Sequence, residues 1–139
     1  MQPVISEFRL ARRVQFYETD SAGIVHFSWF FRYVEEAEHA LWRKAGLSIA
    51  PREAAIGFPR VSASFDFRSP LYFEDQFEVE IRVAAITAKT IRYSATVTRD
   101  QTEIAVGRLT IACVRKGPDG RLKAVEIPLE ITDRFQIAE

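Results

Sequence analysis

Residues 16–27 of the chain read FYETDSAGIVHF, and a helical pattern continues from this stretch as far as Gly46. The stretch places Asp20 in a polar turn between an expected strand and the one long helix that the pattern predicts. Gly23 can adopt a positive φ without the steric cost of a Cβ atom. We therefore predict a sharp backbone reversal at Gly23 that brings amide groups close to a ligand.

The helix that follows is amphipathic. Ser28 is the predicted N-cap and Gly46 the predicted C′ residue, so both helix ends carry recognisable signals. A second stripe lies away from the main apolar face and consists of Phe31, Glu35, Glu38 and Trp42. Its two large aromatic side chains predict that the helix is covered on more than one side, for example by another subunit.

The segments around this helix have other patterns. Residues 11–17 are predicted to form a strand, and residues 47–59 are predicted to be irregular. From residue 61 the period is two, which predicts a half-buried strand whose inward residues are Val61, Ala63, Phe65 and Phe67. Two more strands are expected within residues 76–98, and a long one over residues 103–115. The apolar phase of the long strand shifts across Gly107, which we interpret as a β-bulge.

The predicted order of elements fixes a fold class. One strand and one long helix precede a meander of about four antiparallel strands, a short edge strand at residues 122–127 and a terminal helical turn beyond residue 129. The apolar strand faces can be buried only against the helix, so we expect an α+β fold. A chain of 139 residues with 47% apolar residues suits one domain, residues 1–139.

Composition excludes several classes of function. The 19 lysines and arginines balance 19 aspartates and glutamates, which argues against a nucleic-acid partner. The first ten residues include Glu7 and Arg9 and no apolar run, so we expect no signal peptide, no membrane partner and a cytoplasmic location. Cys113 is the single cysteine, and no metal-ligand cluster accompanies it. We predict that Cys113 is a small core residue.

This order of elements, together with the motif at residues 17–25, resembles the 4-hydroxybenzoyl-CoA thioesterase family of hotdog-fold acyl-CoA thioesterases. The Gly57-Phe58-Pro59 turn, the strand that begins at Val61 and the stretch at residues 125–128 extend the resemblance over the full chain. It implies a long central helix wrapped by a curved antiparallel sheet of about five strands. It also implies homodimers that join their sheets edge to edge and share active sites at the interface, and the family is often tetrameric, so a homotetramer is expected.

The resemblance implies a catalytic carboxylate at Asp20. Asp20 would act on the thioester either as general base for water or as the nucleophile that forms a mixed anhydride, and the sequence leaves both open. The backbone N–H of Phe27 would polarise the thioester carbonyl near the positive end of the helix dipole. His26 either orients substrate and shuttles a proton or merely packs. No metal or other cofactor is implied, because CoA is part of the substrate.

Other positions bear on the acyl group. Glu35 stands where hydroxybenzoyl-specific relatives place an aspartate that meets the phenol hydroxyl, Phe58 replaces a smaller polar residue, and Phe30 stands where a tyrosine is common. We therefore expect an aromatic or medium-chain acyl-CoA as substrate, with residues 47–59 as a flap over the acyl pocket. The remaining expected substrate-binding residues are Gly23 and Val25 beside the turn, and Lys89, Arg121 and Lys123 for the phosphates of CoA. For these three cations the alternative is an ordinary solvated surface, which scattered charges favour.

Three alternatives remain at this point. Asp20 can be an ordinary turn residue or helix cap, since aspartate is common between a strand and a helix. A hotdog hydratase or dehydratase would pair an acid with a histidine in Asp-x-Asn-Pro-x-His, whereas here no Asn-Pro separates Asp20 from His26. A non-catalytic acyl-CoA-binding protein shares the fold but ordinarily carries a DNA-binding segment, which we do not find in the sequence. The thioester carrier could be CoA or an acyl-carrier protein.

Overall fold

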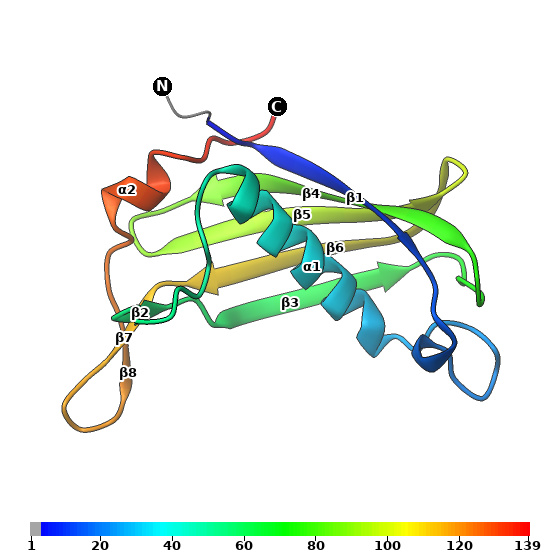
Figure 1. The fold of residues 1–139 in the computed structure, drawn as a ribbon, viewed down its shortest axis with the longest axis horizontal. Coiled ribbons are helices and arrows are strands. Elements are labelled where there is room, and N and C mark those ends of the chain that lie inside the picture. The colour runs from blue at the N-terminus through cyan, green and yellow to red at the C-terminus, as the bar shows by residue number, and fades with distance from the viewer. Residues whose placement is uncertain (1–3) are drawn as a thin grey trace.

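The computed structural model describes residues 4–139 and consists of one long helix lying across a curved antiparallel sheet (Figure 1). The helix is α1 (Ser28–Lys44). The five-stranded sheet has the order β1-β4-β5-β6-β3. Its strands are β1 (Glu7–Arg13), β3 (Arg60–Phe67), β4 (Gln76–Ile86), β5 (Thr90–Arg99) and β6 (Thr102–Ala112). The α+β class and the helix wrapped by five strands are therefore confirmed.

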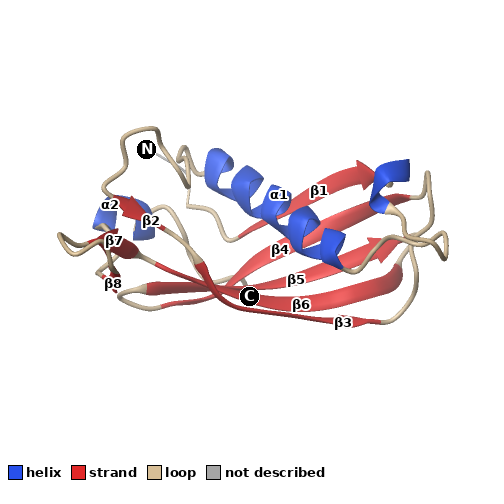
Figure 2. Ribbon diagram, turned by 90° about the horizontal axis from the view of Figure 1, so that it is seen from below, coloured by secondary structure: helices blue, strands red, loops and turns tan. Residues whose placement is uncertain are grey.

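A small second sheet lies at one end of the molecule (Figure 2). It has the order β2-β7-β8, with β2 (Ile56–Gly57), β7 (Val114–Lys116) and β8 (Leu122–Ala124). The short helix α2 (Leu129–Thr132) follows β8, and a single 3-10 turn, η1 (Phe16–Glu18), precedes α1. The small sheet and the loop that leads into α1 lie at opposite ends of the molecule (Figure 1).

The core forms where the apolar face of α1 meets β4, β5 and β6. Residues spaced three and four apart on α1 meet residues spaced two apart on the strands, because these are the periods of helix and strand. The fully buried members include Val34 and Leu41 of α1, Val79 and Ile81 of β4, and Ile91 and Leu109 of the next two strands. Burying each such side chain contributes about 1.5–3 kcal/mol. Cys113 is fully buried in this core, as predicted.

Strand β3 is an edge of the sheet, and α1 covers it only in part, through Phe30 and Phe31. The alternating pattern predicted a half-buried strand, but Val61 is 60% exposed and Phe67 is 49% exposed. Within one chain the predicted burial therefore holds only for Phe65, which is half-buried, because α1 packs mainly against β1 and β4 toward the opposite edge of the sheet. The apolar face of β3 forms a largely exposed strip, defined here as Val61, Ala63, Phe65 and Phe67.

The ends of α1 confirm one signal and correct another. Gly46 has φ of +81°, and the Leu47 N–H donates to the Trp42 carbonyl at 2.9 Å, which is the expected glycine-terminated end. At the other end Phe27, not Ser28, is the N-cap. Ser28 is the first helical residue, and its backbone N–H donates to Nδ1 of His26 at 3.2 Å.

Distant residues decide two further predictions. The helix is covered on a second side at Trp42, as predicted, but by Phe58 and Phe135 of the same chain, whose ring centroids lie 5.0 and 5.2 Å away, and cover by another subunit stays a prediction. The β-bulge lies at residues 103–105, where Val97 pairs with Ala105 and Thr98 pairs with Glu103. Gly107 pairs regularly, and a Cβ atom there would lie 2.5 Å from the Phe65 ring.

The first strand also differs from its prediction. It spans Glu7–Arg13 rather than residues 11–17, because residues 16–18 fold into the 3-10 turn η1. Within the part of the chain that the structure describes, no helix is long and apolar enough to cross a bilayer.

Candidate active site

The loop of residues 18–27, called here the Asp20 loop, doubles back on itself before α1. The Asp20 N–H donates to the Ile24 carbonyl at 2.8 Å, and the Gly23 N–H donates to the Asp20 carbonyl at 2.9 Å. Gly23 has φ of +82°, so the predicted reversal is confirmed. Oδ1 of Asp20 accepts the Ala22 N–H at 2.8 Å, as a turn aspartate commonly does. No donor among residues 4–139 bonds its other oxygen, Oδ2, which is thereby available for chemistry.

The start of α1 presents a backbone donor in the same loop. The His26 N–H donates to the Glu18 carbonyl at 2.8 Å, which closes the base of the loop. Nδ1 of His26 accepts the Ser28 N–H and lies 2.8 Å from the Ser28 hydroxyl, so the proton of a neutral ring is assigned to Nε2. Within residues 4–139 no acceptor bonds the N–H of Phe27. That N–H and the positive end of the helix dipole can stabilise a developing negative charge.

A pocket of about 480 Å³ lies beside the second half of α1. It contains Glu35 and Phe58 together, two of the residues expected to meet the acyl group. Most of the predicted flap, from Ile49 to Pro59, forms its other wall. The Phe58 ring packs on Trp42, which is itself buried, so this wall rests on the core.

The pocket also contains an ion pair that the sequence did not suggest. Nη2 of Arg60 lies 3.0 Å from Oε1 of Glu38, whose side chain is only 2% exposed. Burial raises the pKa of Glu38, and the positive charge of Arg60 opposes that rise. The only sequence signal was the place of Glu38 in a helical stripe with two aromatic residues.

Two other expected substrate residues lie in the core. Phe30 is 3% exposed and packs edge-on against Phe67 at 5.1 Å. Val25 is 4% exposed, and its N–H donates to the Leu71 carbonyl at 2.8 Å. The structure therefore separates these two from the pocket that contains Glu35 and Phe58.

The three expected phosphate-binding cations gather at the end of the molecule with the small sheet. Lys89 lies in the β4–β5 turn, and the Cys113 N–H ties that turn to the start of β7 by donating to the Lys89 carbonyl at 2.8 Å. Arg121 and Lys123 lie beside and within β8. Arg115 of β7 pairs directly opposite Lys123. Like charges placed opposite each other are unfavourable, so a bound anion would relieve them, and sequence reasoning missed Arg115.

A larger groove of about 930 Å³ lies on the sheet formed by β1, β4 and β5. Charged side chains of both signs line it, and they pair with one another, as Nε of Arg9 does with Glu80 at 2.8 Å. None of the expected site residues lines this groove. Although this groove is larger than the pocket beside α1, we therefore do not assign it as the substrate site.

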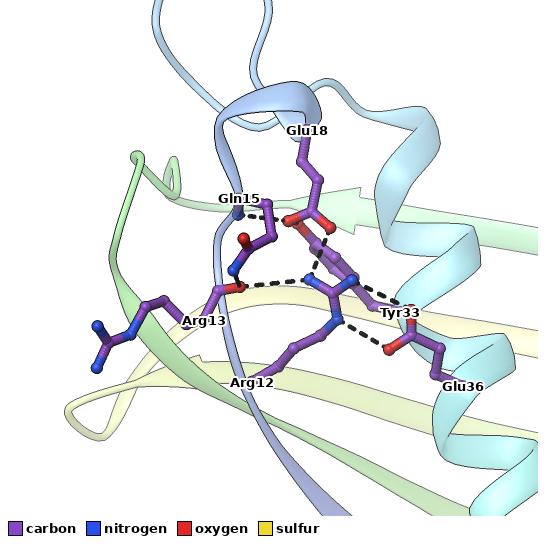
Figure 3. Close-up of polar contacts among 6 residues, drawn as sticks. All are labelled: Arg12, Arg13, Gln15, Glu18, Tyr33 and Glu36. Atoms are coloured by element: carbon purple, nitrogen blue, oxygen red, sulfur yellow. Dashed lines mark hydrogen bonds and ion pairs between the residues drawn. The ribbon is translucent and has the colours of Figure 1, made fainter.

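A buried carboxylate stands at the base of the Asp20 loop. Oε1 of Glu18 accepts hydrogen bonds from the Gln15 N–H and the Tyr33 hydroxyl, both at 2.8 Å, and Oε2 lies 2.7 Å from Nη1 of Arg12 (Figure 3). Burial, with the hydrogen bond and charge of Glu18, raises the pKa of Tyr33. For Arg12 burial alone would lower the pKa, but Glu36 and Glu18 outweigh it and raise the pKa. The sequence predicted only a polar turn here.

The raised tyrosine pKa values predict how stability depends on pH. Burial raises the pKa of Tyr33 and of Tyr93, so the folded chain keeps both hydroxyl protons where the unfolded chain loses them, from about pH 10 upward. The unfolded state then binds fewer protons, and the free energy of unfolding falls as pH rises through this range. Urea unfolding of the wild type and Tyr33→Phe from about pH 8 to 11 should give a shallower decline in the variant. If the free energy of unfolding fell equally with pH in both proteins, the raised pKa of Tyr33 would not be a cause of the decline.

Comparisons with known proteins agree on one family. A family model described as "Thioesterase-like superfamily" matches residues 14–135. A "Putative esterase" of Aquifex aeolicus is 33% identical over 127 residues, 91% of this chain and 95% of that protein. A 1,4-dihydroxy-2-naphthoyl-CoA hydrolase of Synechococcus elongatus is 23% identical over 136 residues, 96% of this chain and 98% of that protein. The solved structure of a gentisyl-coenzyme A thioesterase superposes with a TM-score of 0.80 at 25% identity, covering 89% of this chain and 98% of the other.

Proposed function

The chain belongs to the thioesterase-like superfamily and is a thioester hydrolase, and we propose that it cleaves an aromatic acyl-CoA into the free acid and CoA. The observation that carries this proposal is the Asp20 loop, which offers an unbonded carboxylate oxygen and an unbonded helix-start N–H in one small unit. The finer assignment to the 4-hydroxybenzoyl-CoA type rests on the motif around Asp20. No metal or other cofactor enters the reaction that we propose.

The proposed chemistry divides between a side chain and the backbone. In one route Asp20 removes a proton from the water that attacks the thioester carbon, and the thiolate of CoA leaves with the free acid as the other product. In the other route Asp20 attacks that carbon itself, the thiolate leaves, and water then hydrolyses the mixed anhydride to the free acid and the Asp20 carboxylate. The carbonyl oxygen becomes an oxyanion, and the Phe27 N–H donates to it. One such donor commonly contributes about 3 kcal/mol to transition-state stabilisation. His26 would act through its cap on Ser28, which holds the start of α1 in place.

An aromatic acyl group fits the pocket beside α1 best. Its volume of about 480 Å³ lies in the range of pockets that bury small ligands. Phe58 offers an aromatic wall, and Glu35 offers a carboxylate that can accept a hydrogen bond from a hydroxyl on the acyl group. Relatives whose names state a substrate act on 1,4-dihydroxy-2-naphthoyl-CoA or on gentisyl-CoA. Both observations favour a hydroxylated aromatic acyl group over a medium-chain one.

We further propose that the active site is shared between two copies of the chain. Within one copy, the Asp20 loop and the basic small sheet lie at opposite ends (Figure 1). Antiparallel pairing of two β3 edges about a two-fold axis would bring the small sheet of one copy toward the Asp20 loop of the other. It would also bring partner residues toward the apolar strip on β3, in which Val61 and Phe67 are exposed in one chain. Arg115, Arg121, Lys123 and Lys89 would then meet the CoA phosphates from the partner's side, and pairs of dimers would give the expected tetramer.

A panel of thioesters tests the proposed function. Hydroxylated aromatic, unsubstituted aromatic, phenylacetyl and medium-chain acyl groups would be assayed on CoA, and the best of them on acyl-carrier protein, for release of free thiol. We expect the hydroxylated aromatic acyl-CoA to give the highest kcat/KM. Hydration of an unsaturated acyl-CoA without thiol release would support the hydratase alternative. Binding of acyl-CoA with no turnover of any thioester would support the alternative of a non-catalytic acyl-CoA-binding protein.

A further inference from the structure

Glu18 is an unusual residue to find fully buried, because removing a carboxylate from water is costly unless its charge and hydrogen bonds are matched. Here Arg12 pairs with the charge through Oε2, and two hydrogen bonds reach Oε1, so the contacts come from three places in the chain. The Arg12 guanidinium comes from β1, the Gln15 N–H from the turn between β1 and η1, and the Tyr33 hydroxyl from α1 (Figure 3). The carboxylate therefore joins the strand, the turn and the helix at one point.

The backbone of Glu18 is tied to the same region. Its carbonyl accepts the His26 N–H at 2.8 Å, and its N–H donates to the Gln15 carbonyl at 3.0 Å. Asp20 follows two residues after Glu18, and Phe27 follows directly after His26. Glu18 is thus connected to both ends of the Asp20 loop. It is the first residue of the loop, and its carbonyl binds His26 near the other end.

We propose that Glu18 is a positioning residue, which fixes the Asp20 carboxylate and the Phe27 N–H relative to α1 and so sets the rate of thioester hydrolysis. The proposal rests on the function proposed above and extends it beyond the residues that touch substrate. A carboxylate and an oxyanion donor act together only when both are held near the reacting carbon, and a misplacement of about 1 Å can cost about 10²-fold in rate. Glu18 supplies that constraint from the side of the loop that faces the core.

Nearby contacts offer control substitutions, which test whether an effect comes from positioning the loop or from the stability of the whole chain. Arg12 also binds Glu36 through Nε at 2.8 Å, and the side chain of Glu36 is 44% exposed. Tyr93 offers a second buried tyrosine, whose hydroxyl accepts the Trp42 Nε1–H at 2.9 Å on the far part of α1. Both tyrosine hydroxyls form buried side-chain hydrogen bonds, but only that of Tyr33 reaches Glu18, whereas that of Tyr93 meets Trp42 and Glu38.

The test compares matched variants. Tyr33→Phe keeps the aromatic ring and removes the hydroxyl that donates to Glu18, and Glu18→Gln removes the charge that pairs with Arg12. We expect kcat to fall about 10-fold in Tyr33→Phe and about 10²-fold in Glu18→Gln, with KM changed less than about twofold. Tyr93→Phe and Glu36→Gln should keep the wild-type kcat. Adding Glu18→Gln to Asp20→Asn should lower kcat by less than Glu18→Gln does alone, because only the Phe27 N–H is then left to position.

A second measurement does not depend on activity. Amide hydrogen exchange in residues 18–27 should become faster in Tyr33→Phe and Glu18→Gln but not in Tyr93→Phe. A wild-type kcat in Tyr33→Phe, or an equal fall in Tyr93→Phe, would overturn the positioning role. If the wild type released no thiol from any thioester, the proposed function would fail, and unchanged exchange in both variants would separately overturn the role of Glu18 in holding the loop.

Discussion

Replacing Asp20 with asparagine is expected to lower kcat for thioester hydrolysis by about 10³-fold, within the range that general acid–base groups usually contribute. The amide oxygen of asparagine can still accept the Ala22 N–H, which Oδ1 of Asp20 accepts at 2.8 Å. The loop should therefore fold as before, while the base or nucleophile is lost. Thiol release under saturating substrate gives kcat, and thermal unfolding verifies that the variant is folded.

The control for this substitution is Asp100→Asn. Asp100 lies in the exposed β5–β6 turn and has φ of +48°, a conformation that asparagine tolerates well. It should keep the wild-type rate. If Asp20→Asn turned over substrate at nearly the wild-type rate, Asp20 would be a turn residue only. A single turnover in ¹⁸O-labelled water that leaves label in the Asp20 carboxylate would demonstrate the anhydride route, since only water attack at the Asp20 carbon of a mixed anhydride puts oxygen from water into the protein.

Replacing Ala63 with glutamate is expected to give a folded monomer whose thioesterase activity is at least about 10²-fold lower. Ala63 lies near the middle of β3 and is exposed in one chain, so a charge there costs the monomer little. In an antiparallel pair of β3 edges, the two introduced carboxylates would lie near each other in an apolar strip, and both like charge and desolvation oppose association. Light scattering gives the mass, and the thiol assay gives the rate.

Ala84→Glu is the matched substitution for this experiment. Ala84 is also an exposed alanine in a strand, but it lies on β4, away from the β3 edge. It should keep both the wild-type mass and the wild-type rate. A monomeric Ala63→Glu protein with full activity would show that one chain holds a complete site, and a monomeric wild type would reject the shared site altogether.

The sequence predicted those parts of the fold that depend on neighbouring residues. The extent of α1, the glycine at its end and the antiparallel meander follow from periodicity and capping, which operate over a few residues. The reversal at Gly23 follows in the same way, because only the local backbone decides it. The position of Asp20 was therefore predictable, since it lies between two such features.

What the sequence could not predict depends on partners far apart in the chain. Glu18 reads as part of a polar turn, and only Tyr33 on α1 and Arg12 on β1 make its burial possible. Likewise, periodicity alone suggested a bulge at Gly107. The structure shows instead that the missing side chain leaves room for the ring of Phe65, which lies on another strand. Such tertiary contacts carry no local signature.

The burial of Cys113 has a practical consequence for all of these measurements. It is the single cysteine of the chain, its side chain is inaccessible, and burial raises its pKa, so little reactive thiolate forms at neutral pH. Chromogenic disulfide reagents should therefore report liberated coenzyme without a background from the folded enzyme. A slow colour change in the absence of substrate would then indicate that Cys113 has become accessible because the variant unfolds.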